Sequence, residues 1–138
     1  MAELSASHRQ ELIRRCVEIR TNAHAPYSKF SVGASLLTYD NKYFDGVNVE
    51  NASYGLTICA ERSAIASAVS AGYKTGDFVA VAVATEGGHS PCGACRQVLV
   101  EFGPELIVLL VDTANPDDAE VTTMRELLPR MFQFPDRS

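Results

Sequence analysis

The chain has 138 residues, of which 46% are hydrophobic and 21% charged, and its formal net charge is −5. This composition is close to the globular average and excludes a disordered chain, a collagen and a coiled-coil rod. The acidic balance argues against a nucleic-acid partner, because affinity for nucleic acids comes largely from Lys and Arg. No apolar run approaches the roughly 20 residues of a membrane span, and Met1 to Gln10 lack the apolar core of a signal peptide. We therefore expect one cytoplasmic domain over residues 1–138, with reduced thiols and no membrane partner.

Helical and extended patterns alternate along the chain. In order, the predicted elements are a helix over 7–22 capped by Ser5 or Ser7, strands over 31–38 and 43–49 that form a hairpin, a helix over 59–71, a buried strand over 78–84, a helix over 92–102, a buried strand over 106–111, a short strand over 121–123 and a last helix over 124–128. Continuous apolar strands between helices indicate an α/β fold whose sheet is covered on both faces.

The chain contains four cysteines, and they occur in two kinds of context. Cys16 lies within the amphipathic pattern of the first helix, which indicates a small buried hydrophobic residue. Cys59, Cys92 and Cys95 each lie at the start of a predicted helix. Two disulfides are formally open but are unneeded in a chain of this size. Cys92 and Cys95 taken alone are also compatible with a redox Cys-x-x-Cys pair.

The helix starts at 59–61 (CAE) and 91–95 (PCGAC) predict a metal centre. Unpaired N–H groups and the positive end of the dipole stabilise thiolates at a helix N-terminus. Because Cα–Cβ bonds tilt toward that end, Cys59, Cys92 and Cys95 can share one Zn²⁺ ahead of both helices. Arg62 adds a cation beside them. We expect the two helices to follow adjacent parallel strands and to aim their N-termini at this ion.

Three protein ligands are typical of a catalytic zinc site, which keeps a position for water. Glu61 is then the candidate for the group that moves the proton of that water. The alternative is a structural zinc module in which His89, three residues before Cys92, completes a Cys₃His set.

Five ordered stretches of the chain resemble the cytidine deaminase family, in its small all-cysteine form. They are 26–34 (PYSKFSVGA), 48–54 (NVENASY), 59–62 (CAER), 90–97 (SPCGACRQ) and 126–129 (ELLP). The resemblance implies three α/β/α layers around a central five-stranded mixed sheet, and a homotetramer with one zinc ion per subunit. It also implies hydrolytic deamination of cytidine and 2′-deoxycytidine to uridine and 2′-deoxyuridine, with release of ammonia, in pyrimidine salvage. Deamination of a related compound such as blasticidin S is the alternative within this class, although the Asn-x-Glu-Asn stretch favours a nucleoside.

The resemblance also assigns roles to individual residues. Cys59, Cys92 and Cys95 bind zinc, Glu61 is the proton shuttle, and Arg62 donates to the zinc thiolates. The implied substrate contacts are Phe30, Asn48, Val49, Glu50, Tyr54 and Ala60. Phe132 is the best match to the aromatic residue that closes a neighbouring subunit's pocket, and Phe134 is the second candidate. If Glu50 accepts a hydrogen bond from the ribose 3′-hydroxyl, a 3′-phosphate is excluded by charge.

Overall fold

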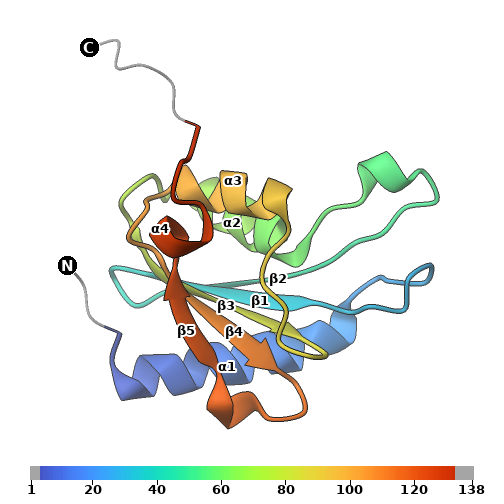
Figure 1. Ribbon diagram of the computed structural model, residues 1–138, viewed down its shortest axis with the longest axis horizontal. Coiled ribbons are helices and arrows are strands. Elements are labelled where there is room, and N and C mark those ends of the chain that lie inside the picture. The colour runs from blue at the N-terminus through green and yellow to red at the C-terminus, as the bar shows by residue number, and fades with distance from the viewer. Residues whose placement is uncertain (1–3, 133–138) are drawn as a thin grey trace.

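The computed structural model describes residues 4–132, which form a central sheet between two helical layers (Figure 1). The helices are α1 (Ala6–Ile19), α2 (Ala60–Ser70), α3 (Gly93–Val100) and α4 (Met124–Leu127). The strands are β1 (Gly33–Thr38), β2 (Tyr43–Val47), β3 (Phe78–Thr85), β4 (Ile107–Asp112) and β5 (Glu120–Thr123). Short 3₁₀ turns follow α1 (Arg20–Asn22), precede α2 (Tyr54–Leu56) and precede β5 (Pro116–Asp118). Each predicted helix and strand is present, so the predicted α/β/α fold is confirmed.

The sheet has five strands in the order β2-β1-β3-β4-β5 and is mixed, as predicted. β1 pairs antiparallel with both β2 and β3, β3 pairs parallel with β4, and β4 pairs antiparallel with β5. The expectation that α2 and α3 follow adjacent parallel strands is wrong. They follow β2 and β3, and β1 lies between these strands because the hairpin places it against β2 while its other edge pairs with β3.

Alternation along the strands divides the core in two. On one face, Leu36, Val83 and Val108 pack with α2 and α3. On the other face, Leu37 and Leu109 pack with Cys16 and the rest of the apolar stripe of α1. Because side chains alternate between the faces of a sheet, neighbouring residues of β1 serve the two layers.

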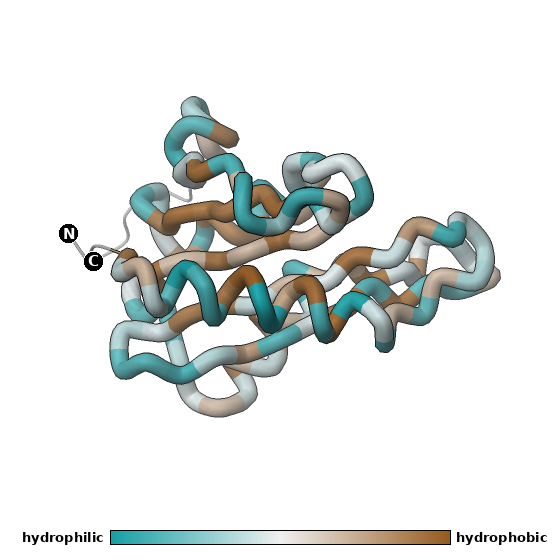
Figure 2. Tube along the Cα trace, turned by 90° about the horizontal axis from the view of Figure 1, so that it is seen from below, coloured by the Kyte–Doolittle hydropathy of each residue, from teal (hydrophilic) through white to brown (hydrophobic). Residues whose placement is uncertain are grey.

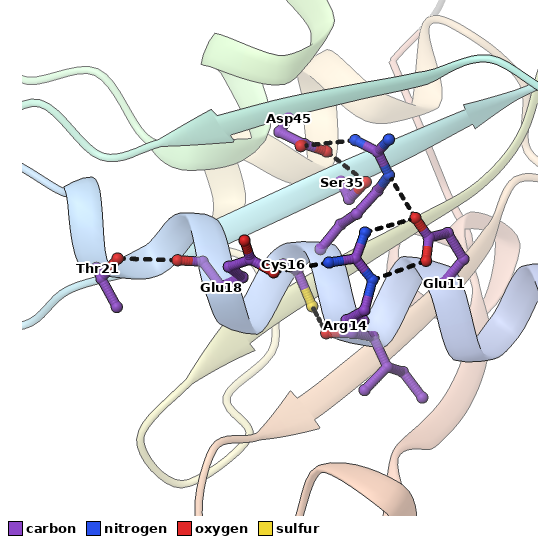
Figure 3. Close-up of polar contacts among 9 residues, drawn as sticks. Glu11, Arg14, Cys16, Glu18, Thr21, Ser35 and Asp45 are labelled. Carbon is purple, nitrogen blue, oxygen red and sulfur yellow. Dashed lines mark hydrogen bonds and ion pairs between the residues drawn. The ribbon is translucent and has the colours of Figure 1, made fainter.

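The first helix, α1, begins at an N-cap serine and carries an ionic network on its outer side. Ser5 is the cap, since its Oγ accepts a hydrogen bond from the amide of His8 at 3.1 Å. Arg14 binds Glu11 and Glu18, with shortest N–O distances of 2.7 Å (Figure 3). Seen from below, hydrophilic and hydrophobic residues alternate along this helix (Figure 2). Within residues 4–132, no helix combines the length and apolar character needed to cross a membrane.

Two loops project together to one side of the sheet (Figure 1). They comprise residues 24–32, which follow α1, and 48–58, which precede α2. Isolated β-bridges join Val49 to His24 in the other loop and to Ile58 in its own loop, and they hold the two loops side by side. We call the two loops together the projecting lobe. This lobe brings the sequence stretches 26–34 and 48–54 to the same end of the molecule as the N-terminus of α2.

Candidate active site

Three thiols meet where the N-termini of α2 and α3 converge. Cys59 is the N-cap of α2, Cys92 is the N-cap of α3, and Cys95 lies in the first turn of α3. Their sulfur atoms all lie within 4.8 Å of one another. Neither cap side chain accepts a hydrogen bond from a backbone amide of its own helix, so both sulfurs remain available to a ligand. In the described part of the chain this is the one metal-ligating cluster of its kind, and His89 does not belong to it.

The position of α2 depends on a glycine in β2. A Cβ atom at Gly46 would lie 2.4 Å from the amide nitrogen of Ala64 and 2.5 Å from the carbonyl oxygen of Ala60. The helix backbone therefore rests directly on the strand backbone. The hydroxyl of Ser63 adds a hydrogen bond to the carbonyl of Val47 at 3.0 Å. These contacts fix the position of Cys59 in the site, and no sequence motif marks Gly46.

The surroundings of the thiols favour negative charge on Cys59. A hydrogen bond from Cys95, aided by Arg62, lowers the pKa of Cys59 to about 5. The same bond to Cys59, together with burial, raises the pKa of Cys95. Arg62 Nη2 lies 3.4 Å from the sulfur of Cys59, and its Nε atom is buried with no partner among residues 4–132. A half-buried guanidinium that donates to a cysteine sulfur fits a cluster of thiolates around zinc, the metal such ligands prefer.

The carboxyl group of Glu61 completes this chemistry. Glu61 is the second residue of α2, only 4% of it is exposed, and it lines the same cavity as the three cysteines. Burial raises the pKa of this carboxyl, and the charge of Cys59 acts in the same direction. A carboxyl group that holds its proton at higher pH than usual is suited to act as both base and acid.

The cavity has a volume of about 230 Å³ and a buried floor. Ala60, Glu61 and Cys95 lie deep in it, whereas Phe30 and His89 stand at its exposed mouth. The complete lining is Phe30, Val32, Asn48, Thr57, Cys59, Ala60, Glu61, Val83, Thr85, His89, Ser90, Pro91, Cys92 and Cys95. The fold thus brings most of the predicted site residues together. It adds Thr57, Val83 and Thr85, for which no motif gave a signal.

The side chain of Asn48, in one loop of the lobe, holds the other loop, which carries Phe30. The Asn48 amide donates to the carbonyl of Phe30 at 2.8 Å and accepts from the amide of Val32 at 2.9 Å. Asn48 is itself almost fully buried and lines the cavity. Its side chain therefore fixes the loop that carries the aromatic ring.

Glu50 and Tyr54 line a second hollow of about 370 Å³ beside the first. Thr57 lines both hollows. The Glu50 carboxylate accepts from the amides of Tyr27 and Ser28 at 3.0 and 3.1 Å, and also from the hydroxyl of Ser28. These bonds lower the pKa of Glu50, so the group is a fixed anion. Val49, the residue between Asn48 and Glu50, lines neither hollow.

Arg96 fastens the zinc-binding turn to the C-terminal segment. Its guanidinium donates to the carbonyl of Pro91 at 2.9 Å, the carbonyl of Leu127 at 2.9 Å and the hydroxyl of Ser90 at 2.7 Å. Next to it, Gln97 donates to the carbonyl of Phe132 at 3.3 Å. The Phe132 side chain is exposed. Phe134 lies outside the described residues.

A model of the cytidine and deoxycytidylate deaminase zinc-binding region matches residues 6–111 of this chain. The chain belongs to this family. A probable cytidine deaminase of Dictyostelium discoideum is 46% identical over 135 residues, which cover 92% of this chain and 88% of that protein. The cytidine deaminase of Sporosarcina psychrophila is 45% identical over 130 residues, which cover 94% of each chain. The crystal structure of the Burkholderia pseudomallei cytidine deaminase superposes with a TM-score of 0.85 at 52% identity, covering 89% of this chain and 98% of that one.

The family match and the geometry together distinguish a three-cysteine metal site from a redox pair and from a Cys₃His module. The sulfurs of Cys59, Cys92 and Cys95 are positioned to hold one metal ion, and the matching family model is that of a zinc-binding region, as the prediction of a zinc cofactor requires. A redox pair leaves Cys59 unexplained, although its sulfur lies with the other two. The Cys₃His module lacks its fourth ligand, because His89 stands at the mouth of the cavity beside Phe30.

Proposed function

We propose that this protein hydrolyses cytidine and 2′-deoxycytidine to uridine and 2′-deoxyuridine, with release of ammonia. The observation that carries the proposal is one small cavity that is lined by three thiols and a buried carboxyl group. The names of the relatives support cytidine as the substrate. The proposal treats residues 1–138 as one catalytic domain.

Each of the side chains that line the cavity has a defined role in the proposed reaction. Cys59, Cys92 and Cys95 hold zinc, which when bound acts as a Lewis acid that eases the loss of a proton from water. Glu61 accepts this proton and passes it to ring nitrogen N3 of the base. The water oxygen bonds to C4 as a hydroxyl; Glu61 then takes the remaining proton from this hydroxyl and delivers it to the amino group, so that the C4–N bond breaks, ammonia leaves and the C4 carbonyl of uridine forms. Ala60 lies against the base edge, and Phe30 packs against its face.

The sugar is bound on the side of the lobe. Asn48 and Glu50 meet the 3′-hydroxyl, while Val49 and Tyr54 complete this side. An ionised carboxylate has about four acceptor positions, and three on Glu50 are already used, which leaves room for one hydroxyl donor. A 3′-phosphate is repelled by the same anion. Arg96 is engaged by three protein oxygens and is therefore not a clamp for a 5′-phosphate.

A homotetramer is part of the proposal. Its support is the apolar surface of the projecting lobe, where Tyr27, Tyr54, Leu56 and Ile58 are all exposed. In such an assembly, Phe132 closes the pocket of a neighbouring subunit. We place the enzyme in the cytoplasm, in pyrimidine salvage, because thiol ligands require a reducing compartment.

The decisive experiment follows the loss of cytidine absorbance as uridine forms, with a chelated sample as control. We expect turnover of cytidine and 2′-deoxycytidine, about one zinc ion per chain, and no turnover of cytidine 3′-monophosphate. Turnover of blasticidin S alone would transfer the proposal to that substrate. A protein that binds zinc but converts none of these compounds would contradict the proposal.

A further inference from the structure

The mouth of the cavity carries a histidine to which no role has been assigned. His89 lines the same cavity as Glu61 and the thiols, and its ring centroid lies 6.0 Å from that of Phe30. In the described part of the chain, neither ring nitrogen of His89 has a hydrogen-bond partner, and the side chain is exposed. An imidazole at this position can both donate and accept a hydrogen bond.

The loop that carries His89 is held firmly to the sheet. The amide of His89 donates to Thr85 Oγ1 at 2.8 Å, and the amide of Gly87 donates to Asp112 Oδ1 at 3.1 Å. These acceptors lie at the carboxyl ends of β3 and β4. Gly87 has a φ of 100°, and a Cβ atom on it would lie 2.8 Å from Nε2 of His89. The glycine thus permits both the turn and the position of the ring, and the backbone that carries His89 is held in place before any ligand binds.

Chemistry determines which part of a nucleoside faces this ring. In cytidine, the sugar is attached at N1, on the opposite side of the ring from C4. If C4 faces the buried floor at Glu61, the sugar must point to the mouth, where His89 and Phe30 stand. The proposed function assigns the 3′-hydroxyl to Asn48 and Glu50, and 2′-deoxycytidine has no 2′-hydroxyl. The 5′-hydroxyl is the group that both substrates share and that has no partner yet.

We propose that His89 binds the 5′-hydroxyl of the nucleoside and thereby sets substrate affinity rather than the rate of the chemical step. This inference rests on the proposed function and adds a sugar contact to it. A residue that binds ground state and transition state alike changes KM and leaves kcat unchanged.

The test compares His89→Ala, His89→Phe and His89→Asn with the unsubstituted enzyme on cytidine, 5′-deoxycytidine and 3′-deoxycytidine. Phe keeps the ring contact with Phe30 but cannot hydrogen-bond, whereas Asn keeps a donor and an acceptor. For cytidine, Ala and Phe should raise KM by about fivefold to tenfold, the value of one hydrogen bond, with kcat and zinc content unchanged. Asn should recover most of the affinity. For 5′-deoxycytidine, all four proteins should share one KM.

Each other outcome overturns the inference in a recognisable way. A His89→Phe enzyme with unchanged KM would show that only the ring surface matters. A fall in kcat or in zinc content would assign His89 a role in supporting the loop. If the difference in KM between the variants and the unsubstituted enzyme disappears with 3′-deoxycytidine rather than with 5′-deoxycytidine, the 5′ assignment is refuted. If the unsubstituted enzyme does not convert cytidine, the proposed function itself fails and the inference falls with it.

Discussion

The two faces of the sheet place the same residue types in opposite environments. On the α1 face, Cys16 is fully buried, its sulfur donates to the carbonyl of Ile13, and burial raises its pKa to about 12. On the α2–α3 face, Cys59 receives hydrogen bonds from Cys95 and Arg62, and its pKa falls to about 5. The thiol on the first face is a packing group, and the thiol on the second is suited to bind a metal ion.

The glutamates show the reverse contrast. Glu11 on α1 is bound by Arg14 and Arg15, and its hydrogen bond with Arg14 lowers its pKa to about 2 (Figure 3). Glu61 on α2 is buried, and burial raises its pKa. Residue type therefore does not determine chemistry in this protein. What decides it is whether the neighbours are carbon, cations or other anions.

The sharpest way to break the comparison is to make the same substitution on both faces. Cys95→Ser should remove zinc and lower kcat/KM by at least about 10³-fold, because the Lewis acidity of the metal contributes several kcal/mol. Cys16→Ser should keep zinc and kcat and lose only stability, by about 1–3 kcal/mol for a buried hydroxyl. Metal analysis, kinetics and urea denaturation check these outcomes. Loss of zinc from the Cys16 variant would contradict the division between the faces.

The next largest effect is expected from a pair of substitutions that replace a glutamate by glutamine. Glu61→Gln keeps the shape of the side chain but cannot shuttle protons, so kcat should fall by about 10²–10⁴-fold with zinc retained. Glu11→Gln is the matched control on α1 and should leave kcat unchanged. Steady-state kinetics with metal analysis of both variants is the measurement. Retained turnover in Glu61→Gln would remove the shuttle role from this residue.

The two faces also differ in what their arginines do. Arg62→Ala removes the donor to the sulfur of Cys59 and should weaken zinc binding by about 10–100-fold, the usual effect of losing a partner of a metal ligand. Arg14→Ala, which breaks only exposed pairs on α1, should leave zinc affinity unchanged. Competition with a chromophoric chelator measures both affinities. Equal affinities in the two variants would show that Arg62 does not tune the metal site.

The smallest effect concerns the reactivity of Cys16. Because its pKa is about 12 in the folded protein, the group stays a neutral thiol at pH 8, and the thiolate is the nucleophile. Iodoacetamide at pH 8 should therefore modify Cys16 only after unfolding, while Cys92 in the chelated protein reacts. The contribution of the buried thiol to stability is complete below pH 9 and is lost as the pH rises toward 12. Mass spectrometry of the labelled peptides locates the modified residue. Rapid labelling of native Cys16 would contradict its burial.

Much of the metal site could be predicted because it is encoded locally. Cys59 and Cys92 each follow a loop and begin a helix, and both properties depend on near neighbours in the chain. The direction of Cα–Cβ bonds at a helix start then aims the sulfurs ahead of the helix. The same local logic marked Glu61 as a group beside the metal.

The arrangement around this centre depends on contacts between distant segments. Nothing in the motifs indicates that β1 separates β2 from β3, since strand order is set by pairing across the whole chain. Gly46 carries no sequence signal, although only the absence of a Cβ lets α2 rest on β2. The contacts of Glu50 with Ser28, 22 residues away, and of Arg96 with Leu127, 31 residues away, are similar cases.

The sequence by itself determined the set of metal-ligating groups, because helix starts and residue spacing bring the right atoms to the N-terminal ends of two helices. Only the tertiary structure decided how those ends meet, which carboxylates are buried, and that His89 stands at the mouth rather than on the metal. The physical reason is the distance along the chain over which the interactions act. Helix starts follow from interactions within a turn, whereas burial and cavity shape come from packing between segments far apart in the chain.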